Sequence, residues 1–96
     1  MGYGILDLMR VIAIKMLKEF WKKPRYSDSE PALSAWYIEA KHVTWNTPQD
    51  IKDKYRNASF LSDNRVVFNI HGNKYRLVAH INYTYKIVYI KFIRTH

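Results

Sequence analysis

Apolar and polar residues alternate along the second half of the chain, which is the period of half-buried β-strands. We expect the apolar rows to face the core of an antiparallel sheet. These rows align across neighbouring strands only if each connecting loop has an even number of residues, because a shift by one residue would turn a row to solvent. His71-Gly72 and Tyr85-Lys86 would satisfy this as turns. The rows are Val66, Phe68 and Ile70, then Tyr75, Leu77, Ala79, Ile81 and Tyr83, then Val88, Ile90 and Phe92.

In the first part of the chain, the apolar residues instead recur with the spacing of a helix. After a short strand over Val11 to Ile14, the apolar residues Ile14, Leu17 and Trp21 recur on one face of a helix that should stop at Pro24. A turn follows this helix.

A second helix is predicted after Ser29, which can serve as its N-cap, with Pro31 in the first turn. Aromatic residues within it could be imagined as platforms for stacking bases, but they keep the helical period and are better explained as core residues. The apolar stripe of this helix is Leu33, Trp36, Tyr37 and Ala40.

A short third helix should begin after Thr47, with Pro48 at its first position and Asp50 where an acid favours the helix dipole. It should end near Tyr55. The sequence shows no repeat and no linker, so its 96 residues predict one domain with a single core.

The amino-acid composition excludes several kinds of site. The chain has no cysteine, which excludes disulfides, thiolate metal sites and a cysteine nucleophile and agrees with a reducing, cytoplasmic location. Charged residues interrupt the first twenty positions, so we expect no membrane span there. The four histidines have no metal-ligand spacing, and we expect neither a metal nor a cofactor.

Charge is distributed unevenly. The formal net charge is +8, yet all eight acidic residues precede residue 64, whereas residues 64–96 carry six basic residues and no acid. Such an asymmetry indicates a face for a polyanion, with nucleic acid favoured over an acidic protein or a lipid surface.

The expected strand pairing gathers the basic residues on the face opposite the core. This face could be no more than the solvated side of a half-buried sheet. A solvated face usually mixes acids with bases, however, and like charges on adjacent strands repel, so the absence of acids favours a binding surface. The expected patch is Arg65, Val67, Asn69, Lys74, Arg76, Val78, His80, Lys91, Ile93 and Thr95.

Four stretches, "WNTPQDIK", "ASFL", "RVVFNIHGNKYRLV" and "FIRTH", together resemble the HigB toxins of bacterial type II toxin-antitoxin modules. The resemblance covers about Met9 to His96. It implies a RelE-like α+β fold, with N-terminal helices packed on one face of a small antiparallel sheet and RNA on the other. It also implies an mRNA interferase that cuts translated message on the ribosome and is silenced, in a hetero-oligomer, by a HigA antitoxin with a helix-turn-helix domain.

Position by position, the resemblance matches the family's basic strand residues to Arg65, Lys74 and Arg76, and the histidine of its "TH" signature to His96. Family members usually continue with a tail of the "EYD" kind where this sequence stops, and often have glycine where Arg94 stands. Residues 1–8 precede the usual "MRVI" start and receive no role, which leaves a single toxin domain over residues 9–96 that lacks the usual tail.

Metal-free cleavage of RNA needs a base for the 2′-hydroxyl, cations for the phosphate and an acid for the departing oxygen. Guanidinium groups suit the phosphate, while His80, His96, or a Lys74 or Lys91 whose pKa is lowered by neighbouring cations, could move protons. Regular alternation puts His96 on the core-facing side unless a bulge near the strand end moves it. The catalytic candidates are Arg65, Lys74, Arg76, Lys91 and His96. The RNA-binding candidates are Arg65, Asn69, Lys74, Arg76, His80, Lys91 and Arg94. The alternative is a protein that binds RNA or the antitoxin without catalysis.

Overall fold

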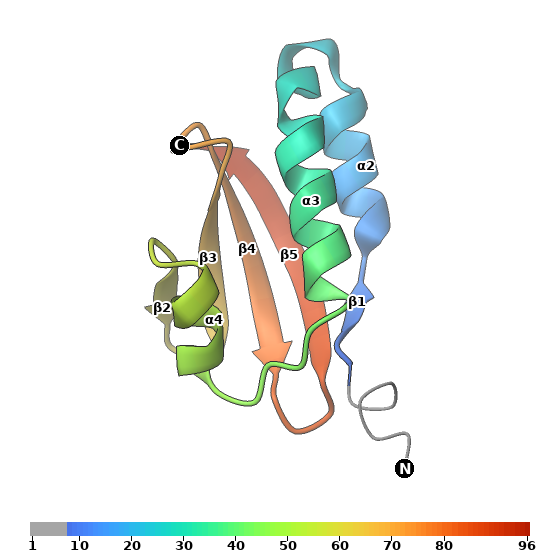
Figure 1. Ribbon diagram of the computed structural model, residues 1–96. Helices are drawn as coiled ribbons and strands as arrows, with labels where there is room; N and C mark the ends of the chain where they lie inside the picture. The colour runs from blue at the N-terminus through green and yellow to red at the C-terminus, as the bar shows by residue number, and fades with distance from the viewer. Residues whose placement is uncertain (1–7) are drawn as a thin grey trace.

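The computed structural model describes residues 8–96 and has an α+β fold, as the sequence predicts (Figure 1). All but the last residue of the predicted extra segment, Met1 to Leu8, lies outside the described residues. In chain order the elements are β1 (Arg10–Ile12), α2 (Ile14–Lys22), the 3-10 helix η1 (Pro24–Ser29), α3 (Glu30–Ala40), α4 (Pro48–Lys54), β2 (Ser59–Leu61), β3 (Arg65–Ile70), β4 (Tyr75–Asn82) and β5 (Ile87–Thr95).

Helices α2 and α3 lie side by side and are joined at one end by η1 (Figure 1). The predicted stop of α2 before Pro24 is confirmed. Ser29 occupies the N-cap position of α3, but its hydroxyl donates a hydrogen bond of 2.6 Å to the carbonyl oxygen of Tyr26 and caps nothing. The predicted cap is therefore correct in position and wrong in its hydrogen bond, because η1 leads straight into α3.

Helix α4 begins as predicted. The hydroxyl of Thr47 accepts a hydrogen bond of 3.3 Å from the backbone N–H of Asp50, and the Asp50 carboxylate accepts one of 3.2 Å from the backbone N–H of Thr47. This reciprocal capping box satisfies two donors that the first helical turn leaves unpaired.

The sheet has the order β1-β5-β4-β3-β2. Strand β1 runs parallel to β5, whereas the other neighbours are antiparallel. The sheet is thus mixed, and the expectation of a purely antiparallel sheet is wrong. A parallel pair needs a long crossover connection, which the chain from α2 to β4 supplies here.

Both connections between β3, β4 and β5 have an even number of residues, as predicted, but each has four and not two. Ile70 pairs with Tyr75 and Asn82 pairs with Ile87, so the loops are residues 71–74 and 83–86. The predicted two-residue turns are wrong in length. The core rows of β3 and β4 still align because four, like two, preserves the alternation of faces.

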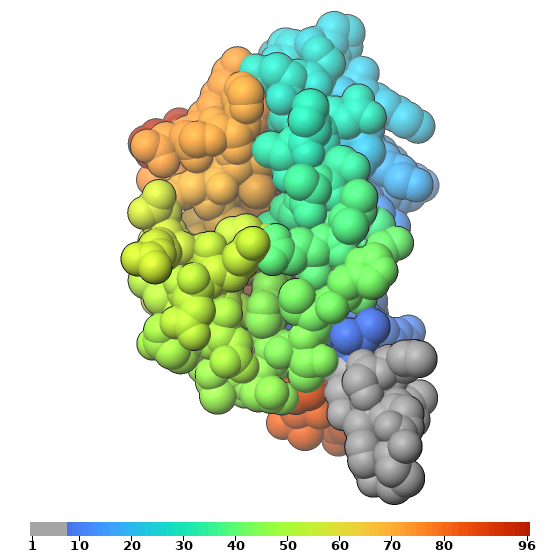
Figure 2. Space-filling model, viewed as in Figure 1, coloured from blue at the N-terminus to red at the C-terminus, as the bar shows by residue number. Residues whose placement is uncertain are grey.

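The buried residues of the helices and of the sheet form one core cluster. Phe68 of β3 is at its centre and fully buried, with its ring 5.3 Å from that of Trp36 in α3 and 5.1 Å from that of Tyr55 after α4. The predicted core role of Trp36 is confirmed. Figure 2 shows the segment from α3 to β2 covering much of this side of the molecule. None of the helices in residues 8–96 is long and apolar enough to cross a membrane.

Candidate nucleic-acid interface

An irregularity in β5 decides which side chains share the face opposite the core. Ala79 of β4 pairs with Ile90, but the next residue back, Val78, pairs with Phe92. Lys91 is the extra residue between these pairs and forms a β-bulge. Because a bulge adds one residue to one strand, the side chains that follow it exchange faces.

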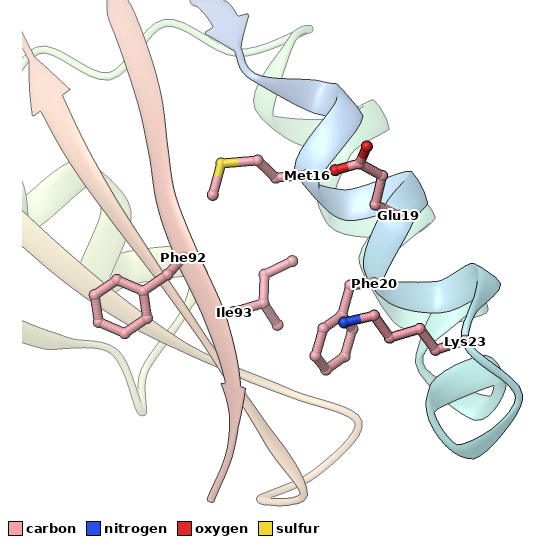
Figure 3. A pocket seen from close by; sticks show the side chains of 6 residues that line it. All are labelled: Met16, Glu19, Phe20, Lys23, Phe92 and Ile93. Atoms are coloured by element: carbon pink, nitrogen blue, oxygen red, sulfur yellow. The ribbon is translucent and has the colours of Figure 1, made fainter.

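The exchange is visible in the close view of β5 (Figure 3). Ile93 points toward Met16 and Phe20 of α2, whereas Phe92 projects from the other side of the strand. The predicted core position of Phe92 is therefore wrong, and its side chain is 43% exposed. The placement of Ile93 and Thr95 in the basic patch is wrong as well, since they pair with the core-facing residues Leu77 and Tyr75.

We use "outer face" for the side chains of β3, β4 and β5 that point away from the core, together with His96. Three of its cross-strand rows span all three strands, and none of their members is acidic. The first row is Arg65, His80 and Tyr89, the second is Val67, Val78 and Phe92, and the third is Asn69, Arg76 and Arg94.

Arg76 and His96 form the most specific contact of the outer face. A guanidinium nitrogen, Nη2 of Arg76, lies 2.8 Å from Nε2 of His96. A guanidinium group can only donate hydrogen bonds, so Nε2 of His96 is the acceptor in this contact. The Nε of Arg76 is buried and has no hydrogen-bond partner among the described residues. The bulge brings His96 to this side, which settles the question that regular alternation left open.

Three further predicted residues lie on the outer face. Arg65 is exposed and its Nε donates to the carbonyl oxygen of Ser62 at 3.4 Å. Asn69 donates through Nδ2 to the carbonyl oxygen of Asn57 at 3.2 Å. The ring of His80 lies beside that of Tyr89, with 6.2 Å between ring centres. None of these contacts involves a carboxylate.

The two remaining cations of β5 flank Phe92 along the strand. Lys91 is exposed at the bulge, with its Nζ 5.9 Å from the ring centre of Tyr89. Arg94 is exposed and stands directly across from Arg76. Two guanidinium groups in one cross-strand row repel each other, which favours an anion between or above them.

Lys74 departs from the prediction. It lies in the loop before β4, and its ammonium group forms an ion pair with the carboxylate of Asp28 in η1. The hydrogen bond to Asp28 raises the pKa of Lys74, and the same bond holds the pKa of the Asp28 carboxyl below its ordinary value of 3.8. The prediction of a lowered pKa for Lys74 is therefore wrong, because the fold places next to it an acid that lies 46 residues away in sequence.

Sequence reasoning missed Tyr89 and Phe92 as members of the outer face and Asp28 as the partner of Lys74. A signal for the first two existed. Regular alternation would have put Arg94 on the buried side together with Phe92, and an unpaired charge in a core is costly. The pairing of Asp28 had no local signal. Among residues 8–96, no group of three or more histidine, aspartate or glutamate side chains could hold a metal ion.

No curated protein matches the sequence significantly. A family model does match residues 29–96, a span that includes α3, α4 and every strand from β2 to β5. The family is HigB_toxin, described as the RelE-like toxic component of a toxin-antitoxin system. The chain belongs to this HigB toxin family and is thus the toxin component of a toxin-antitoxin pair, with an antitoxin as its partner.

Proposed function

We propose that this toxin is an endoribonuclease that cuts messenger RNA on the translating ribosome in the cytoplasm and so stops protein synthesis. Its toxin domain would span residues 9–96, and a HigA-like antitoxin would silence it in a hetero-oligomeric complex. The observation that carries the proposal is the contact of 2.8 Å between Arg76 and His96 on a face whose rows hold no acid.

RNA cleavage needs chemical groups that are present on the outer face. A neutral imidazole can accept the proton of a ribose 2′-hydroxyl, whose oxygen then attacks the neighbouring phosphorus. The bond from phosphorus to the 5′-oxygen breaks, and that oxygen takes up a proton, leaving a 2′,3′-cyclic phosphate and a free 5′-hydroxyl. As the acceptor in its contact with Arg76, Nε2 of His96 offers the lone pair that a base needs.

Arg76 and Arg94 are suited to the phosphate. Negative charge accumulates on its oxygens as the fifth bond forms, and guanidinium forks match those oxygens in a bidentate manner. When Arg76 turns to the phosphate, it releases Nε2 of His96 for the proton transfer. Arg65 and Lys91 would hold the RNA backbone on either side. Lys74 would contribute positive charge only, since Asp28 keeps its ammonium group protonated.

His96→Gln tests the proposal most directly. Glutamine keeps polar atoms near Arg76 but cannot carry the proton, so message cleavage on ribosomes should fall about a hundredfold or more. The full reading frame is induced in growing cells, growth arrest is recorded, and cuts are mapped by primer extension.

His42→Gln is the matched control. Its imidazole Nδ1 lies 2.7 Å from the carbonyl oxygen of Ile38 at the end of α3, away from the outer face. This variant should cut normally. If His96→Gln cleaves as well as the unchanged protein, His96 is not the base. If the unchanged protein arrests growth without cutting RNA, the chain acts by binding alone and the endoribonuclease proposal fails.

A further inference from the structure

The middle row of the outer face is apolar although it faces away from the core. Val67, Val78 and Phe92 stand side by side across three strands. Val78 is only 3% exposed, so its neighbours already cover it, whereas the Phe92 ring is 43% exposed and projects from β5 (Figure 3). The exposed ring of Phe92, next to Val67 and Val78, therefore presents a hydrophobic surface to solvent.

Polar residues border this row on both sides, among them the cations Arg65, Arg76 and Arg94. Along β4, Arg76 and His80 lie two positions to either side of Val78, which puts the two polar rows about 13 Å apart by the usual rise of a strand. Along β5, Lys91 and Arg94 bracket Phe92. The surface therefore alternates between charge that attracts phosphate and a ring that can accept a flat apolar partner.

Single-stranded nucleic acids carry this combination. Their phosphates follow a cationic groove while unpaired bases stack on aromatic side chains, and stacking tolerates any base because every base has a π-face. A duplex hides its bases within its own stack. An acidic polypeptide would match the cations, but the ring of Phe92 specifically favours a flat π-system beside a phosphate.

We propose that Phe92 is a stacking platform for one unpaired base of the RNA, next to the phosphate held by Arg76 and Arg94. This inference rests on the proposed function and extends it to the substrate: the toxin takes single-stranded RNA and holds it by a base that it does not read by hydrogen bonds. Lys91 has a part in this arrangement through the bulge, since the extra residue is what turns Phe92 outward.

The test compares two fluorescent RNA oligomers of equal length and charge, one of uridines and one that is abasic throughout. Phe92→Ala should bind the uridine oligomer about fivefold to a hundredfold more weakly than the unchanged protein does, and the abasic oligomer equally well. Phe92→Trp should restore the affinity for uridines, while Phe92→Leu should not. Phe60→Ala is the matched control, because Phe60 is 38% exposed and pairs with the core-facing Val66.

Several results would overturn the stacking platform. One is equal binding of the uridine oligomer by Phe92→Ala and the unchanged protein, and another is no preference of the unchanged protein for uridines over the abasic chain. A third is loss of self-association or of antitoxin binding in Phe92→Ala with RNA affinity intact, which would make the row a protein-docking surface. The cleavage test of His96 is independent of all three, so the proposed function can stand while this inference fails.

Discussion

Replacing Arg76 by alanine separates the chemistry of this side chain from its structural role. Its guanidinium makes one hydrogen bond, to His96, and its buried Nε has no partner in the described part of the chain. Losing the hydrogen bond costs about 0.5 to 1.5 kcal/mol of unfolding free energy. Removing an unpaired buried donor and its repulsion with Arg94 offsets that cost, since like charges across a ladder destabilise by roughly 0.2 to 1 kcal/mol.

We therefore expect Arg76→Ala to change the stability by less than about 1 kcal/mol, as ordinary surface substitutions do. The effect on cleavage should be larger, because losing one donor that stabilises charge in a transition state typically costs about 2.7 to 4 kcal/mol, or roughly a hundredfold to a thousandfold in rate. Growth arrest on induction and primer-extension mapping of cuts on ribosomes would measure this loss, and the thermal midpoint would measure the stability.

Arg56→Ala is the matched control, since Arg56 is an exposed arginine in the turn after α4. It should leave cleavage unchanged. Undiminished cleavage by a stably folded Arg76→Ala protein would refute the reasoning, and the stabilisation of the phosphate would then have to come from Arg94 or Lys91.

Three other outcomes can be measured. Phe68→Ala should lower the unfolding free energy by about 3 to 5 kcal/mol, because its fully buried ring contacts the rings of Trp36 and Tyr55; urea unfolding would show it, and an unchanged midpoint would contradict the described core. Asp28→Asn should lower the thermal midpoint at neutral pH, and the difference in midpoint from the unchanged protein should vanish as the pH falls below 3.8. Because the pKa of Asp28 is lowered in the folded protein, its stabilisation is present above that value and is lost as the carboxyl takes up a proton. A difference in midpoint that does not depend on pH would refute the role of the ion pair. RNA binding should weaken steeply with salt, with a logarithmic slope of about −3 to −4 for four to six phosphates, and a flat response would exclude the outer face as a polyanion surface.

Local signals predicted the end of α2 and the start of α4. Pro24 stops α2, and Thr47 with Asp50 forms a cap within four consecutive residues, so each depends on chemistry that the sequence displays in one place. The alternation of β3 and β4 likewise fixed their core rows, because even loops of any length preserve it.

Features that depend on distant parts of the chain could not be predicted in this way. The pairing of Lys74 with Asp28 joins a strand loop to η1, and the parallel pairing of β1 with β5 joins the two ends of the described chain. The bulge at Lys91 lies between these cases. The residue type of Lys91 does not predict a bulge. In a regular strand, however, Arg94 would share a face with Phe92, so a buried Phe92 would require a buried and unpaired charge at Arg94.

The strand order also determines when the outer face can form during synthesis of the chain. Among the strands of residues 8–96, β5 is the last to be synthesised, yet it lies inside the sheet, between β1 and β4. While the nascent chain still lacks this strand, β1 has no neighbour, β4 is an unprotected edge, and Arg76 has neither Arg94 nor His96 beside it. Long-range closure of this kind is slow, because the chain loses entropy before it gains contacts. Under the proposed function, the outer face is therefore incomplete until β5 joins the sheet, and an antitoxin can bind in the interval between synthesis and closure of the sheet.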